Sequence, residues 1–186
     1  VDTYAKLWRW SVEHKASFWR EMWSFGDVIG VPGDSVLVDA DRMPGARWFP
    51  NVRLNFAQNL LRHRDERCAL WFRGETGQTQ ELSYAELADA VSRLQQALAA
   101  AGVRTGDRVA GFLPNIPEAV VAMLATTSLG AIWSSCSPDF GINGVVDRFG
   151  QIEPKVLFTA ASYAYGGKRF DCLERVAGIL GQIPAI

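Results

Sequence analysis

The chain has 186 residues, of which 48% are hydrophobic and 21% charged, as is typical of a globular protein with one or two domains. Its formal net charge is −1 and opposite charges are interspersed, so neither nucleic acid nor an anionic membrane is an expected partner. The three cysteines are widely separated and only two histidines occur, which predicts neither a disulfide framework nor a zinc site. We therefore expect a cytoplasmic protein with no metal site in this chain.

The N-terminal segment is rich in tryptophan and other apolar residues. These recur at helical spacing from Tyr4 to Trp23 and predict one amphipathic helix that packs on the main domain. The alternative is a helix that lies on a membrane surface, but Glu13 and Glu21 argue against it.

Residues 24–53 contain glycines and prolines throughout and predict a connector rather than a regular element. The aromatic pair in Arg47–Pro50 is expected to anchor this connector, followed by a short helix to about Leu61. The amides of Asn55 and Asn59 are expected to bond loop backbone groups rather than to take part in catalysis.

From Cys68 the pattern becomes regular. Strands are predicted at 68–72 and 79–82, followed by a Ser83–Glu86 capping box that opens a helix ending at Gly102. Further strands are predicted at 108–112, 131–135 and 156–159, the second of them buried, with helices at 117–129 and 143–152. Because helices alternate with short apolar strands, we predict an α/β fold with a layered, mainly parallel sheet and flanking helices.

Motifs for nucleotide chemistry are missing from the sequence. No GxGxxG follows a predicted strand, and the Gly167-Lys168 pair lacks both the first glycine and the hydroxyl residue of a phosphate loop. His14 and His63 lie far from any candidate nucleophile. We therefore expect no catalytic residue in this chain.

Two sequence stretches carry a family resemblance: LPNIPEAVVAMLATTSLGAIWSSCSPDFG, which is residues 113–141, and DRFGQIEPKVLFTA, which is residues 147–160. They resemble the adenylate-forming acyl-CoA synthetases, and within that family the enzymes that activate acetoacetate more than those that activate acetate. The resemblance implies that the chain is the front part of the large N-terminal domain. Residues 1–66 would form a helical extension and connector, and residues 67–186 an incomplete first α/β part.

The resemblance also implies an activity for the full-length protein. ATP, Mg²⁺ and coenzyme A would be used to convert acetoacetate to acetoacetyl-CoA, AMP and pyrophosphate. The remainder of the large domain and a C-terminal domain would be the partners of this part, which alone would be inactive. Two alternatives stay open: a synthetase for another short-chain acid such as acetate or propionate, and a non-catalytic α/β module that binds a ligand or a partner.

Site residues are implied by the resemblance at two places. Tyr165, Gly166, Gly167 and Lys168 match a segment that contacts the nucleotide part of coenzyme A, with glycines allowing close approach of a phosphate and Lys168 supplying charge. A surface turn with an incidental lysine is the alternative. Asp139, Phe140 and Gly141 match a loop that flanks the pantetheine tunnel, although Asp139 could instead initiate the helix near Asn143.

Overall fold

The computed structural model describes residues 2–186, which form two compact units, one ending at Asn59 and the other comprising Leu60–Ile186. The predicted domain boundary after residue 66 stays a prediction. Among the described residues, no helix has the length and apolar character needed to cross a membrane.

The N-terminal unit begins with two helices, α1 (Tyr4–Glu13) and α2 (Lys15–Phe25), where the sequence predicted one. The prediction was wrong because His14 leaves the helical region, with φ −120° and ψ 51°. The break lets the aromatic stripe fold on itself, since the Trp10 and Phe18 rings meet edge to face at 5.5 Å. Packing of this stripe on the main domain stays a prediction.

The connector carries two short strands, β1 (Leu37–Val38) and β2 (Arg47–Trp48), and ends in α3 (Phe56–Leu60). The expected aromatic anchoring is confirmed within this unit: Trp48 contacts Trp19, and Phe49 contacts Trp23. The Asn59 side chain bonds both backbone groups of Ile29, accepting at 2.8 Å and donating at 3.2 Å. Asn59 thus satisfies loop backbone groups as predicted.

The second unit opens with the predicted hairpin, β3 (Cys68–Arg73) and β4 (Thr79–Ser83), which pair antiparallel. The helix α4 (Tyr84–Ala100) follows directly. Its capping box is confirmed, because the Ser83 hydroxyl accepts from the Glu86 amide at 3.1 Å and the Glu86 carboxylate accepts from the Ser83 amide at 2.8 Å.

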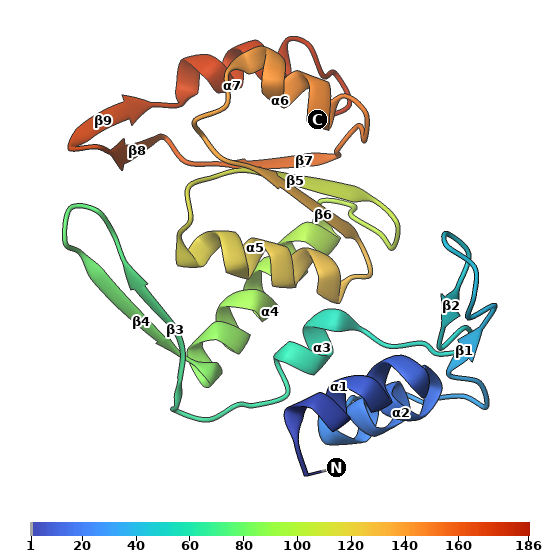
Figure 1. The fold of residues 1–186 in the computed structure, drawn as a ribbon. Helices are drawn as coiled ribbons and strands as arrows, with labels where there is room; N and C mark the ends of the chain where they lie inside the picture. Colours follow the sequence, from blue (N-terminus) through green and yellow to red (C-terminus); the bar gives the residue numbers. More distant parts are fainter. Residues whose placement is uncertain (1) are drawn as a thin grey trace. The chain divides into compact units, whose positions relative to one another are not determined.

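A three-stranded parallel sheet forms the centre of this unit, in the order β6-β5-β7. The strands are β5 (Arg108–Phe112), β6 (Ile132–Cys136) and β7 (Val156–Thr159). Helices α4 and α5 (Pro117–Ser128) cover one face, and α6 (Ile142–Phe149) and α7 (Leu173–Leu180) cover the other (Figure 1). The predicted parallel α/β arrangement is therefore confirmed.

Two details predicted for the second unit, the burial of β6 and the end of α6, were wrong. The strand at β6 was expected to be buried, but Ile132 is 53% exposed because β6 lies at an edge of the sheet. The helix expected to reach residue 152 ends at Phe149, and the chain then turns through Glu153, whose φ is +47°. A second hairpin, β8 (Ser162–Tyr165) and β9 (Lys168–Asp171), was not predicted.

The two faces of the central strand β5 pack differently. Ala110 and Phe112 belong to a fully buried cluster with Val145 and Phe149 of α6 and Ile179 of α7. On the opposite face, an added Cβ on Gly111 would lie 2.6 Å from the Trp133 ring. Glycine at this position therefore makes room for a tryptophan from the neighbouring strand.

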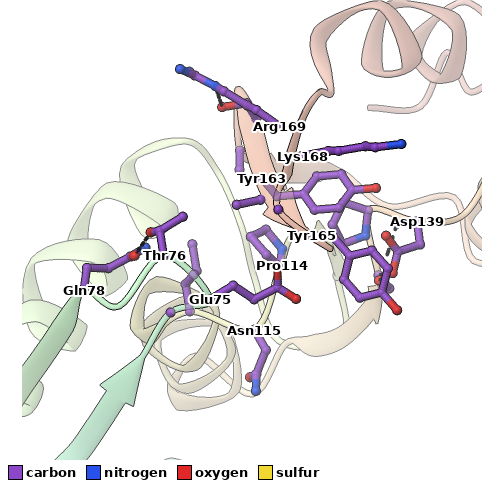
Figure 2. Close-up of a pocket in the computed structure, with 18 of the residues that line it drawn as sticks. Glu75, Thr76, Gln78, Pro114, Asn115, Asp139, Tyr163, Tyr165, Lys168 and Arg169 are labelled. Carbon is purple, nitrogen blue, oxygen red and sulfur yellow. Dashed lines mark hydrogen bonds between the residues drawn. The ribbon is translucent and has the colours of Figure 1, made fainter.

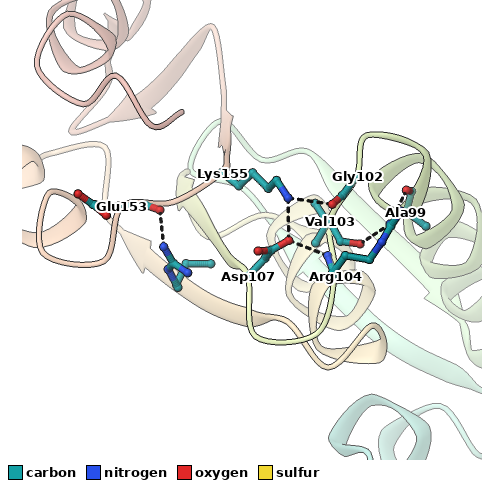
Figure 3. Close-up of polar contacts among 8 residues, drawn as sticks. Ala99, Gly102, Val103, Arg104, Asp107, Glu153 and Lys155 are labelled. Atoms are coloured by element: carbon teal, nitrogen blue, oxygen red, sulfur yellow. Dashed lines mark hydrogen bonds and ion pairs between the residues drawn. The ribbon is translucent and has the colours of Figure 1, made fainter.

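A polar network ties the start of β5 to the segment before β7 (Figure 3). Lys155 Nζ donates to Asp107 Oδ2 at 3.0 Å and to the Gly102 carbonyl at 2.9 Å, and the Arg104 amide donates to the same Asp107 oxygen at 2.7 Å. These bonds, led by that from Lys155, lower the pKa of Asp107 below its ordinary 3.8. The network thus connects the amino ends of β5 and β7 to the loop that follows α4.

Replacing Asp107 with asparagine is expected to lower the free energy of unfolding in a pH-dependent way. Because folding depresses its pKa, the carboxylate stabilises the fold above pH 3.8, and this stabilisation disappears as the pH falls through the folded-state pKa. The difference between the wild type and Asp107→Asn should therefore shrink below pH 3.8 in urea titrations of the full-length protein. Asp89→Asn on the exposed surface of α4 is the control, and an equal shift there would contradict the assignment to Asp107.

Candidate functional site

A cleft of about 810 Å³ lies at the carboxyl end of the parallel sheet. Its walls come from the β3–β4 turn, the loops that follow β5 and β6, and the β8–β9 hairpin (Figure 2). Parallel strands bring the ends of their connecting loops together at this edge, which is where ligands bind in open α/β sheets. The cleft is therefore the candidate site of this unit.

The β8–β9 hairpin carries four of the residues named from the sequence. Tyr165 pairs with Lys168, and Gly166 and Gly167 form the two-residue turn with φ of +57° and +73°. Positive φ at both turn residues is the geometry that hairpins with two-residue turns prefer, and glycine adopts it without strain. The turn itself thus requires the two glycines, and the space around them is open.

Alternation along the strands gives the hairpin two distinct faces. Tyr165 and Lys168 share one face, whereas Arg169 lies on the other, where its Nε donates to the Ser162 hydroxyl at 2.9 Å. Tyr165, Gly167 and Lys168 line the cleft, and Gly166 does not. A lysine and an aromatic ring are thus presented side by side at the cleft.

The loop after β6 carries the other three residues named from the sequence. Asp139 lines the cleft, and its carboxylate accepts from the Ser137 hydroxyl at 2.9 Å. The predicted alternative role of Asp139 as a helix initiator was wrong, because Gly141 is the N-cap of α6. Phe140 faces the guanidinium of Arg148, 4.4 Å from the ring centre, and neither Phe140 nor Gly141 is among the lining residues.

Sequence reasoning missed the wall opposite the hairpin. This wall is the β3–β4 turn, which contributes Arg73, Glu75, Thr76 and Gln78, and near it Asn115 follows β5 (Figure 2). The charged lining residues are three cations and two carboxylates: Arg73, Lys168, Arg169, Glu75 and Asp139. Their mixed but mainly cationic character fits an anionic ligand that also carries neutral polar groups.

Magnesium is not assigned to this cleft. Across residues 2–186, no three histidine, cysteine, aspartate or glutamate side chains are grouped so as to hold a metal ion. Lys168 and Tyr165 suit a phosphate and a planar ring instead.

Family models match nearly the whole chain. Residues 56–183 match the model of the AMP-binding enzymes, and residues 4–60 match that of the acetyl-coenzyme A synthetase N-terminus. The chain therefore belongs to the AMP-binding enzyme family.

Relatives within this family include the acetoacetyl-coenzyme A synthetase of Rhizobium meliloti, 52% identical over 176 residues, which are 95% of this chain and 27% of that protein. The acetoacetyl-CoA synthetase of Macaca fascicularis is 41% identical over 99% of this chain and 28% of its own length. The malonamoyl-CoA synthetase of Penicillium aethiopicum is 39% identical over all of this chain and 27% of its own length.

A solved structure shares the fold of the whole chain. Acetoacetyl-CoA synthetase from Streptomyces lividans matches with a TM-score of 0.93 and 46% identity, covering 100% of this chain and 29% of that one. The chain thus spans a little over a quarter of the length of the relatives it matches. Its α/β architecture is that of the N-terminal part of an acyl-CoA synthetase.

Proposed function

We propose that the full-length protein carrying this chain is an acid–thiol ligase that converts acetoacetate, ATP and coenzyme A to acetoacetyl-CoA, AMP and pyrophosphate. The observation that carries this proposal is the match to the Streptomyces lividans acetoacetyl-CoA synthetase along the entire chain. The acetoacetate carboxylate would attack the α-phosphorus of ATP and expel pyrophosphate. The coenzyme A thiolate would then attack the acyl carbon and expel AMP.

Within this reaction, the present chain would bind the nucleotide part of coenzyme A at the β8–β9 hairpin. Lys168 would donate to a phosphate, and the Tyr165 ring beside it would stack on the adenine. Support comes from their shared face on the hairpin and from their position in the cleft. The loop from Asp139 to Gly141 would border the path of the pantetheine arm.

One specific observation supports a different acid as an alternative substrate. The malonamoyl-CoA synthetase relative is 39% identical over the whole of this chain. A similar N-terminal part is therefore also found in an enzyme that is named for a different acid. Synthesis of malonamoyl-CoA, or of the CoA thioester of another short acid such as acetate or propionate, is therefore the alternative reaction. The three cysteines of the described chain are free, which supports a reducing, cytoplasmic location for either enzyme.

Replacing Lys168 with alanine in the full-length protein is expected to raise the KM for coenzyme A about tenfold, as the loss of one charge-assisted phosphate contact should. Acetoacetate-dependent exchange between ATP and pyrophosphate should stay unchanged, because coenzyme A enters after the adenylate forms. Steady-state thioester formation at varied coenzyme A measures the first quantity, and isotope exchange measures the second.

Two variants control this experiment. Lys168→Arg keeps the charge and should restore most of the affinity, whereas Arg93→Ala removes a charge from the exposed surface of α4 and should change nothing. An unchanged KM for coenzyme A in Lys168→Ala would mean that Lys168 is an incidental residue of a surface turn.

A further inference from the structure

The loop after β6, residues 137–141, is fixed at two points by arginines from the two helices that cover one face of the sheet. Arg175 of α7 contacts the backbone of this loop, and Arg148 of α6 contacts one of its side chains. The loop residues that line the cleft are Ser137, Pro138 and Asp139. The two arginine contacts are thus made by a loop that forms part of the candidate site.

Arg175 satisfies a backbone group of the loop. Its Nη1 donates to the carbonyl of Pro138, 37 positions earlier in the chain, at 2.7 Å. Pro138 is buried and has no N–H, so this carbonyl is its one backbone polar group, and a buried carbonyl without a partner costs free energy. The bond therefore ties the chain at Pro138 to α7, whose Ile179 belongs to the buried core cluster.

Phe140 is held two positions further along the loop. The guanidinium carbon of Arg148 lies over its ring, 4.4 Å from the ring centre, within the range of a cation–π contact. The Arg148 side chain is itself fixed to α6, because its Nη1 donates to the Gly144 carbonyl at 2.8 Å. A Cβ on Gly144 would lie 3.3 Å from the Phe140 ring, so glycine at this position allows the ring to lie close to the helix.

Asp139 lies between these two anchors and lines the cleft (Figure 2). Its carboxylate accepts from the Ser137 hydroxyl at 2.9 Å, a bond made within the loop. Pro138 before it and Phe140 after it are each bound to a helix. The two helices therefore restrict the positions that the backbone of Asp139 can take beside the cleft.

We propose that Arg148 and Arg175 are positioning residues for coenzyme A: they fix the loop after β6 at Phe140 and at Pro138, so that its cleft-lining residues are ordered before the ligand binds. Preorganised contacts bind more tightly because less conformational entropy is lost on binding. The effect on coenzyme A rests on the proposed function, whereas the fixing of the loop does not.

Replacing either arginine with methionine in the full-length protein tests this proposal, because methionine is a long side chain that has neither a donor nor a charge. In the absence of substrates, backbone amides of residues 137–141 should exchange their hydrogens faster in Arg175→Met and in Arg148→Met, whereas those of β5 should not. The KM for coenzyme A should rise about threefold to tenfold in each variant, and ATP–pyrophosphate exchange should stay unchanged.

Three further variants control this experiment. Arg175→Lys and Arg148→Lys keep a charged donor at each position, so they should restore most of the slow hydrogen exchange and of the affinity for coenzyme A. Arg93→Met removes an arginine from the exposed surface of α4 and should change neither quantity.

The readouts separate the positioning role from the coenzyme A site. Unchanged hydrogen exchange of residues 137–141 in both methionine variants overturns the fixing of the loop, and equal acceleration in β5 overturns it too, because it indicates a general loss of stability. Faster exchange confined to the loop with an unchanged KM overturns the positioning role. In that case Lys168→Ala decides the proposed function, because a raised KM in that variant supports the coenzyme A site and an unchanged KM contradicts it.

Discussion

Expressed alone, the 186-residue chain is expected to show no acetoacetate-dependent exchange between ATP and pyrophosphate. Adenylation requires a fixed set of donors around the phosphates, because charge stabilisation provides most of the rate in phosphoryl-group chemistry. The sequence contains no phosphate loop, and residues 2–186 contain no cluster suited to a metal ion. The chain also spans only 27% to 29% of its relatives.

The comparison for this result is the full-length protein assayed at the same molar concentration, which should exchange readily. Circular dichroism of the 186-residue chain shows whether it is folded in the assay. Exchange above background by the folded chain alone would mean that residues recognised neither in its sequence nor in its structure bind the ATP phosphates.

Replacing Phe112 with alanine is expected to destabilise the sheet unit by about 3–5 kcal/mol, the usual cost of emptying a buried phenylalanine site. Phe112 lies on the central strand, is 0% exposed and belongs to the buried cluster under α6 and α7, so its truncation leaves a cavity in the core. Urea unfolding of the full-length protein, with hydrogen exchange of peptides that cover β5, measures the loss.

Phe25→Ala is the matched control, since Phe25 is 84% exposed and its loss should change the free energy of unfolding by less than about 0.5 kcal/mol. A cost for Phe112→Ala no greater than that of Phe25→Ala would contradict the packing of β5 described above.

Local patterns predicted most elements of the sheet unit. The spacing of apolar residues located β5 and β7 at their observed bounds, and the Ser83–Glu86 pattern located the start of α4. These signals depend on residues a few positions apart, so the sequence contains them directly. The parallel order followed from the alternation of helices and strands.

The features that sequence reasoning missed depend on side-chain packing and on sheet topology rather than on the local spacing of residue types. The break at His14 places Trp10 against Phe18, and the exposure of Ile132 follows from the position of β6 at an edge of the sheet. Neither packing partners nor sheet edges can be recognised within a short window of sequence. The fold-back of the aromatic stripe was missed because the apolar periodicity continues through the break at His14.

The candidate site was predicted only in part for the same reason. The resemblance named Lys168 and Asp139, but the hairpin on which Lys168 lies needs the pairing of β8 with β9. The contribution of the β3–β4 turn requires the full sheet topology, since Arg73 and Lys168 are nearly a hundred residues apart.

We propose above that this chain belongs to an enzyme that activates acetoacetate and transfers it to coenzyme A. The most direct measurement is formation of CoA thioester by the full-length protein with ATP and with acetoacetate, acetate, propionate or malonamate supplied separately. We expect the highest kcat/KM with acetoacetate, with AMP and pyrophosphate as the other products. A higher kcat/KM with any of the other acids, or no thioester with any of them, would contradict it.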